Sequence, residues 1–96
     1  MILSFADRTT ADIYDGTASR QARRIDPRLW PLVARRLDAL NAATRIEDLQ
    51  VPPGNRLEKL RGNFAGYWSI RVNERYRIVF KFEAGNASGV RCLDYH

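Results

Sequence analysis

Apolar side chains follow two different periods along this chain, one before residue 52 and another after it. Four of them recur at spacings of four, four and three residues and form one helical stripe: Leu29, Val33, Leu37 and Leu40. Asp26 is a good N-cap, and Pro27 suits the first helical position, where its missing N–H does no harm. The pattern therefore predicts an amphipathic helix that begins at Asp26.

Shorter elements are predicted before this helix. Residues 2–5 are a short apolar run and indicate an edge strand. Residues 8–15 favour a short helix with Ala11 and Tyr14 on its inner side, ended by Gly16. The polar and basic residues 17–24 indicate a loop.

After the long helix, Thr44 and Glu47 have the spacing of a capping box, which favours one more helical turn. Pro52-Pro53-Gly54 then breaks the chain, and alternating apolar positions follow. The alternation is weak over residues 56–60 and clear over 67–73 and 75–82, with a turn at 61–66, a loop at 85–89 and a last strand at 90–96. This order predicts one domain over residues 1–96 with an α+β fold, in which two N-terminal helices pack on a small, mainly antiparallel twisted sheet.

The two central strands are expected to form a hairpin whose register is fixed by burying both apolar faces on one side. The paired apolar residues are then Trp68 with Phe80, Ile70 with Ile78, and Val72 with Tyr76, and residues 73–75 form the loop. On the other face the same register sets Arg71 opposite Arg77, and Tyr67 opposite Lys81.

Like charges directly opposite each other in a sheet are destabilising, so the facing Arg71 and Arg77 need an explanation. Two guanidinium groups in mid-sheet make sense if a phosphate or a carboxylate lies between them. The alternative is structural, with Asp94 or a backbone carbonyl satisfying one of the two arginines.

The charge of the chain points the same way. It carries 16 basic and 11 acidic residues, a net charge of +5, with a pI near 10.0, and fourteen of the basic residues are arginine. Seven basic and two acidic residues lie between Arg56 and Lys81, so this segment holds the whole net charge. Such a segment favours a surface for a polyanion, and the alternative is a solvated basic face without a ligand.

Composition excludes several other classes of protein. No apolar run of about 20 residues is present, so we expect no membrane span, and the first residues do not have the pattern of a signal peptide. A single cysteine, Cys92, excludes an internal disulfide and a zinc cluster, and we expect it to be a small buried side chain. The default expectation is a cytoplasmic protein.

The C-terminal Asp94-Tyr95-His96 adds candidate chemistry. His96 is the only histidine, and an ordinary histidine has a pKa of about 6.5, which suits acid–base work near neutral pH. Asp94 is two residues away on the same face of the strand and could orient it, and Tyr95 could stack on a nucleobase. The alternative is that the histidine is merely frayed and exposed.

The run from Leu60 to Phe80, which includes Gly66-Tyr-Trp-Ser-Ile-Arg-Val72 and an arginine four residues after Asn73, resembles the HigB branch of the RelE/ParE toxin superfamily, as does the C-terminal Asp-Tyr-His. The helix-rich front half matches only in order and length. The resemblance implies a RelE-like fold and a ribosome-dependent endoribonuclease that cleaves mRNA in the ribosomal A site with no metal or other cofactor. In such a reaction the RNA 2′-hydroxyl attacks the adjacent phosphate and the 5′-oxygen leaves.

The resemblance also assigns site residues. It implies that Arg77 is the central phosphate-binding arginine and that Arg61 is a basic residue at the turn. It further makes Asp94, Tyr95 and His96 the terminal catalytic group. Glu58 stands where some relatives have a histidine, so either Glu58 is the base or His96 covers more of the acid–base work. Further RNA contacts are expected from residues in or beside the basic segment: Arg71, Arg56, Lys59 and Asn73.

The implied partners are mRNA on the 70S ribosome and a HigA-like helix-turn-helix antitoxin, with operator DNA contacted only through the antitoxin. Candidate contact regions for the antitoxin are the N-terminal helices and the basic stretch Arg20–Arg36. Two alternatives stay open. One is a non-catalytic relative that acts by binding ribosomal or antitoxin surfaces, and the other is a gyrase-directed toxin.

Overall fold

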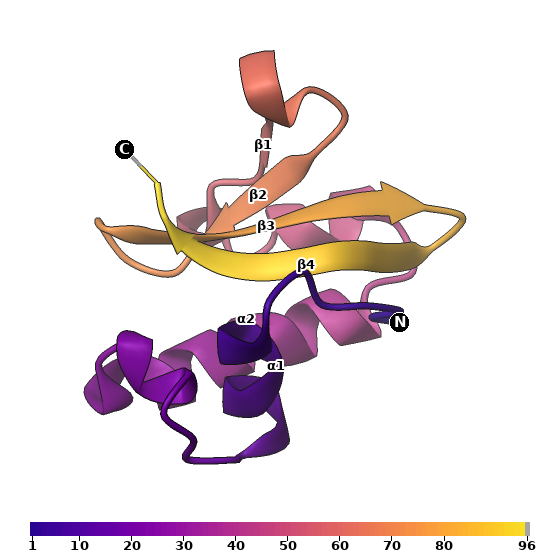
Figure 1. Cartoon of the computed structure of the whole chain (residues 1–96). Helices are drawn as coiled ribbons and strands as arrows, with labels where there is room; N and C mark the ends of the chain where they lie inside the picture. The colour runs from indigo at the N-terminus through magenta and orange to yellow at the C-terminus, as the bar shows by residue number, and fades with distance from the viewer. Residues whose placement is uncertain (96) are drawn as a thin grey trace.

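The computed structural model describes residues 1–95 and contains two α-helices and one antiparallel sheet (Figure 1). The elements are α1 (Arg8–Asp15), α2 (Trp30–Ala42), β1 (Glu58–Lys59), β2 (Trp68–Arg71), β3 (Tyr76–Glu83) and β4 (Asn86–Asp94). Figure 1 shows α1 and α2 on one side of the sheet, with the short turn Gly62–Phe64 standing on the other. The predicted α+β architecture is confirmed.

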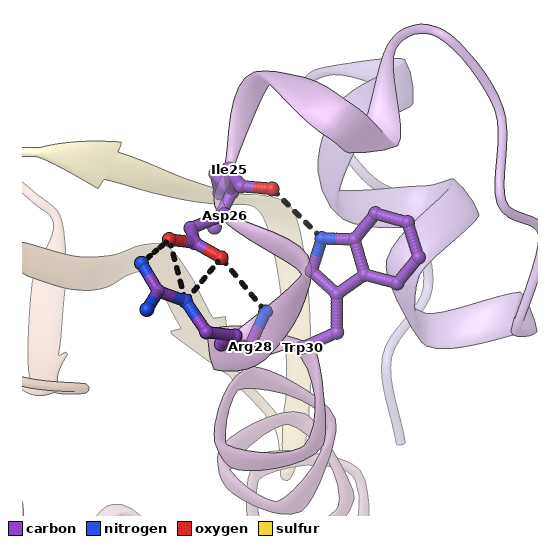
Figure 2. A network of polar contacts seen from close by, with 4 residues as sticks. All are labelled: Ile25, Asp26, Arg28 and Trp30. Carbon is purple, nitrogen blue, oxygen red and sulfur yellow. Dashed lines mark hydrogen bonds and ion pairs between the residues drawn. The ribbon is translucent and has the colours of Figure 1, made fainter.

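The predicted capping by Asp26 is confirmed, but the α-helix begins four residues later. Asp26 Oδ1 accepts the N–H of Arg28 at 2.9 Å and opens a 3₁₀ turn over Pro27–Leu29, after which α2 starts at Trp30 (Figure 2). A continuous α-helix would set the ring of Pro31 against the carbonyl of Pro27, so the proline is accommodated only in a first turn. Within α2 the apolar stripe is buried as predicted.

The inner side of α1 is not the one predicted. Its buried side chains are Thr9, Thr10, Asp12 and Ile13, while Ala11 and Tyr14 are half-buried. The reason is that polar groups join this helix to the sheet, because Thr10 Oγ1 accepts the backbone N–H of Cys92 at 2.8 Å. Gly16 ends the helix in the left-handed conformation, as predicted (φ 76°).

The turn after α2 is capped by a different acid from the one predicted. Residues Ile46–Gln50 form a 3₁₀ turn, and Asp48 Oδ2 accepts the N–H groups of Thr44 and Arg45 at 3.0 and 3.1 Å. Glu47 instead pairs with the Arg45 guanidinium at 2.7 Å. The turn begins one residue later than predicted, with Arg45 as its N-cap, so the acid three residues on is Asp48 and not Glu47.

The strand order is β1-β2-β3-β4, with every neighbouring pair antiparallel. The hairpin register predicted from burial is confirmed for Trp68–Phe80, Ile70–Ile78 and Arg71–Arg77. The predicted N-terminal edge strand is reduced to two parallel bridges beside β4, formed by Ile2 and Phe5.

The predicted loop over residues 85–89 is wrong, because β4 already begins at Asn86. Only Ala84 and Gly85 connect β3 to β4, with φ angles of 50° and 78°. Two consecutive positive φ angles make the type of tight turn whose twist matches a hairpin, so the strands continue to pair up to it.

The main core lies between the helices and one face of the sheet, where the α2 stripe meets Ile70, Ile78 and Phe80. Cys92 is buried in this core, as predicted. The other face of the sheet also buries side chains, since Ser69 and Val79 are fully covered. Neither of the two α-helices in the described part of the chain has the length and apolar character needed to cross a membrane.

Candidate functional site

A hollow of about 440 Å³ lies on the face of the sheet that is turned away from the helices. Its lining combines three arginines, two glutamates and two other polar side chains: Arg56, Arg71, Arg77, Glu58, Glu74, Asn73 and Tyr95. Six of these seven were candidate site residues from the sequence. Glu74, in the hairpin loop, was not, although its place between the two facing arginines is visible in the sequence.

Strand alternation decides which candidates reach the hollow. Glu58 pairs with Ser69 across β1 and β2, so it lies on the same face as Arg71 and Arg77. Lys59 pairs with Trp68 and therefore points to the other face, where its Nζ lies 5.7 Å from the centre of the Trp68 ring. The structure thus brings Glu58 to the paired arginines and keeps Lys59 away from them.

Arg77 is a well-shielded cation, with a side chain only 13% exposed. Its Nε donates to Ser69 Oγ at 2.7 Å and its Nη2 donates to the backbone carbonyl of Arg56 at 2.6 Å. Burial lowers the pKa of Arg77, and the nearby Glu58 carboxylate, 3.9 Å from Nη2, opposes that change. Arginine nevertheless stays protonated at any physiological pH, so the site holds a fixed positive charge.

Arg71 lies directly opposite Arg77 and is half-buried. Within residues 1–95 its guanidinium makes no hydrogen bond or ion pair, although its backbone carbonyl accepts Arg36 Nε from α2 at 3.1 Å. The alternative that a backbone carbonyl satisfies one of the paired arginines therefore holds for Arg77 and not for Arg71.

The hairpin loop at the rim of the hollow is closed by Asn73. Its Oδ1 accepts the N–H groups of Arg75 and Tyr76 at 3.0 and 2.7 Å, a local side-chain turn that fixes the loop. The Asn73 oxygen is thus already engaged within the loop.

The C-terminal residues are divided between the two faces of the sheet. Tyr95 lines the hollow, its ring centre is 6.1 Å from that of Phe64, and its N–H donates to the Arg75 carbonyl. Asp94 pairs with Tyr76 on the opposite face, and its carboxylate accepts Arg75 Nε at 2.8 Å. The possibility that Asp94 satisfies one of the facing arginines is therefore wrong. His96 lies outside the described residues.

Arg61, like Lys59, does not line the hollow. It is exposed at the start of the turn Gly62–Phe64. Among the described residues no group of three His, Cys, Asp or Glu side chains could hold a metal ion. The hollow offers an anion two facing guanidinium groups, one of them held by hydrogen bonds, with two carboxylates and a phenol beside them. Such an arrangement can bind a phosphate group and stabilise additional negative charge on it.

Comparisons with known proteins agree with this picture. Residues 3–96 match the family described as "RelE-like toxin of type II toxin-antitoxin system HigB". Toxin HigB-1 of Vibrio cholerae serotype O1 is 39% identical over 87 residues, which cover 91% of this chain and 90% of the relative. Endoribonuclease HigB of Proteus vulgaris is 41% identical over 61 residues, which cover 64% of this chain and 65% of the relative.

Solved structures share the fold. A chain of the YoeB-YefM complex from Staphylococcus aureus superposes with a TM-score of 0.61 at 18% identity, covering 100% of this chain and 95% of the other. At that identity the likeness concerns the fold alone.

Proposed function

The chain belongs to the HigB family of RelE-like toxins of type II toxin–antitoxin systems, and from this premise we propose that it is an endoribonuclease that cuts mRNA in the ribosomal A site. The observation that carries the proposal is the pair Arg71 and Arg77, opposite each other in a polar hollow that also contains Glu58. The Proteus vulgaris relative, which is named an endoribonuclease, supports it.

The proposed reaction is an internal transfer at phosphorus. The RNA 2′-hydroxyl forms a bond to the adjacent phosphorus and gives its proton to a base, while the bond to the 5′-oxygen breaks and that oxygen takes up a proton. The products are a 2′,3′-cyclic phosphate and a 5′-hydroxyl. The reaction needs one proton acceptor, one proton donor and cations for the charge that builds on the phosphate oxygens.

We assign these roles to residues that line the hollow and to His96, which lies outside the described residues. Arg77 and Arg71 stabilise the phosphate charge, and the Arg56 side chain adds a third cation. Glu58 accepts the 2′-hydroxyl proton, and His96 protonates the leaving oxygen. Tyr95 stacks on a base, an interaction worth about 1–3 kcal/mol by substitution in other proteins.

The remaining candidates act at the edges of the site. Asp94 holds the terminal segment through Arg75. Asn73 keeps the rim of the hollow in shape through the hairpin loop. Arg61 and Lys59 lie outside the hollow, so their proposed role is to contact RNA phosphates further along the strand.

The small number of catalytic residues in this site suggests why the reaction would need a ribosome. Bringing two reacting groups into the correct geometry can supply several kcal/mol of a barrier, roughly 7–11 in favourable cases. An open hollow on a small sheet offers little that could align the 2′-oxygen, the phosphorus and the 5′-oxygen. We infer that mRNA held in the A site arrives already aligned, which makes the cytoplasm, where ribosomes translate, the place of action.

The proposed partner is a HigA-like antitoxin, which alone would bring the pair to operator DNA. A second hollow of about 270 Å³ lies between α1 and the start of α2, lined mainly by apolar side chains that include Ile13, Pro27, Trp30 and Pro31. Trp30 Nε1 donates to the carbonyl of Ile25 at 3.0 Å (Figure 2). It also donates to the carbonyl of Ala22 at 3.1 Å, and the two hydrogen bonds fix the indole at this surface. This hollow, bordered by the basic stretch Arg20–Arg36, supports antitoxin docking on the helices.

The experiment that tests the nuclease proposal is primer extension on mRNA bound to translating ribosomes. We expect A-site cuts by the wild type and at least tenfold fewer by Arg77→Ala and by a chain lacking His96. Arg91→Ala is the matched control. Arg91 lies opposite Val79, on the same face of the sheet as Arg77, and does not line the hollow.

The outcomes separate the alternatives. Cutting that survives the loss of His96 leaves the enzyme intact but shifts the acid–base work to Glu58. A folded wild type that stops growth while mRNA stays whole overturns the nuclease proposal in favour of a toxin that acts by binding, directed at the ribosome or at gyrase.

A further inference from the structure

The guanidinium of Arg77 is held by two short hydrogen bonds to neutral acceptors, and the Ser69 carbonyl adds a longer contact to Nη2 at 3.5 Å. Ser69 is fully buried on β2, and its hydroxyl accepts Arg77 Nε at 2.7 Å. The second acceptor is the backbone carbonyl of Arg56, 2.6 Å from Nη2. One contact comes from within the sheet and the other from the loop before β1, so together they fix the plane of the guanidinium.

The Arg56 carbonyl reaches Arg77 because Arg56 adopts the left-handed conformation, with φ 44° and ψ 57°. A side chain other than glycine rarely adopts this conformation, and it persists only where the surroundings enforce it. The residue before it supplies such an anchor, since Asn55 is buried and its Nδ2 donates to the carbonyls of Leu49 and Val51 at 3.3 Å each. The loop is therefore built to present this carbonyl.

The chemical nature of the two acceptors matters. A carboxylate in either place would fix the guanidinium but cancel its charge, whereas a hydroxyl and a carbonyl fix it without adding a negative charge. Glu58 is an ion-pair partner of Arg77, but at 3.9 Å from Nη2 its carboxylate is too far to form a hydrogen bond. Within residues 1–95 Arg77 Nη1 makes no hydrogen bond, so its two N–H groups are left for an anion.

We propose that Ser69 and the left-handed Arg56 carbonyl are positioning groups that pre-orient Arg77 toward the scissile phosphate. This inference rests on the proposed ribonuclease function and deepens it. Pre-orientation contributes to the transition state more than to binding of the ground state, because the charge it meets develops during the reaction. Loss of either group should therefore lower kcat while KM changes little.

The first test changes Ser69. We expect Ser69→Ala to lower kcat at least tenfold with KM within twofold of wild type, and Ser69→Thr, which keeps a hydroxyl, to recover most of that loss. Ser88→Ala is the matched control, since Ser88 lies on β4 opposite Lys81 and outside the hollow. Equal kcat for wild type and Ser69→Ala would overturn the proposal.

The second test separates the backbone of Arg56 from its side chain. Arg56→Gly and Arg56→Val remove the same charge, but glycine tolerates the left-handed conformation and valine does not. We expect Arg56→Val to have at least tenfold lower kcat than Arg56→Gly, both measured well below their melting temperatures. Equal rates for the two folded variants contradict the carbonyl's role, and if the valine variant does not fold, the Ser69 series decides.

A spectroscopic readout does not depend on nuclease activity. The ¹H–¹⁵N resonance of Arg77 Nε–H, assigned with Arg77→Lys, should be slow to exchange in the wild type and should shift and exchange faster in Ser69→Ala. An unchanged resonance contradicts the Ser69 contact even if cleavage falls. If the wild type cuts no RNA, the ribonuclease proposal fails, and a resonance that shifts still assigns Ser69 as the group that holds Arg77.

Discussion

Replacing Arg71 with threonine should make the protein more stable and less active. Arg71 and Arg77 are direct cross-strand partners, and like charges in such pairs cost about 0.2–1 kcal/mol. The upper end applies here, because Arg77 is only 13% exposed and water screens it poorly. After burial, the neighbouring charge of Arg71 is a further cause that lowers the pKa of Arg77, which reflects the same repulsion.

The gain can be expressed as a melting temperature. For a chain of 96 residues, about 1 kcal/mol of stability corresponds to a rise in Tm of about 4–8 °C. Threonine also suits a strand better than arginine does, so part of any gain could come from β-propensity. Arg91→Thr is the matched control, since Arg91 lies on the same face of the sheet but opposite the uncharged Val79.

The assay is thermal unfolding followed by circular dichroism at low salt and in 1 M NaCl, with RNA cleavage measured in parallel. We expect the Tm of Arg71→Thr to exceed that of Arg91→Thr at low salt, and the difference to shrink at 1 M, where the screening length falls to about 3 Å. Cleavage should fall at least tenfold for Arg71→Thr only. The reasoning would be refuted if the Tm of Arg71→Thr at low salt were lower than that of Arg91→Thr. It would also be refuted if the difference in Tm between the two variants were the same at low salt and in 1 M NaCl.

Three further predictions concern the fold. Thr10→Val should lower the free energy of unfolding by about 1–3 kcal/mol in urea titrations, because it leaves the buried Cys92 N–H without its acceptor at 2.8 Å. Thr10→Ser keeps the hydroxyl and should leave the free energy of unfolding unchanged. Equal losses for the two variants would contradict the role of the hydroxyl. Burial raises the pKa of the Cys92 thiol to about 12, so iodoacetamide at pH 8 should label the unfolded but not the folded chain, and rapid native labelling would count against the buried thiol. Hydrogen bonds from Arg28 lower the pKa of Asp26 to about 2, so the contribution of this carboxylate to stability is present above pH 3.8 and is lost as the pH falls through 2. The difference in Tm between wild type and Asp26→Ala should therefore shrink over that pH range. A difference that stays constant would contradict the prediction.

The central hairpin could be predicted because its physics is local. Two strands of alternating apolar residues must bury the same face, and a slip of one residue would expose all of them. The facing positions of Arg71 and Arg77 follow from that requirement, and the structure confirms them. The capping of the long helix at Asp26 was visible for the same reason, since the capping group and its donor are two residues apart.

The wrong predictions have separate causes, none of which the local pattern of residues shows. The inner side of α1 is set by Thr10, which reaches a backbone donor 82 residues away in the sequence. The cap after α2 is Asp48 because the turn starts after Arg45, which makes Asp48 its third residue. The last hairpin is longer than predicted because Ala84 adopts a positive φ, which is uncommon for alanine.

The sequence by itself determined the order of helices and strands, the register of the central hairpin and the concentration of positive charge beside it, because each depends on residues close together in the chain. The tertiary structure decided which residues share the hollow with the paired arginines. It brings Glu58 in and turns Lys59 out, because the register of β1 on β2 decides their faces. It also pairs Asp94 with Arg75 and places the Arg56 carbonyl against Arg77, across 19 and 21 residues of sequence. Such contacts depend on how distant segments pack, and no local pattern encodes them.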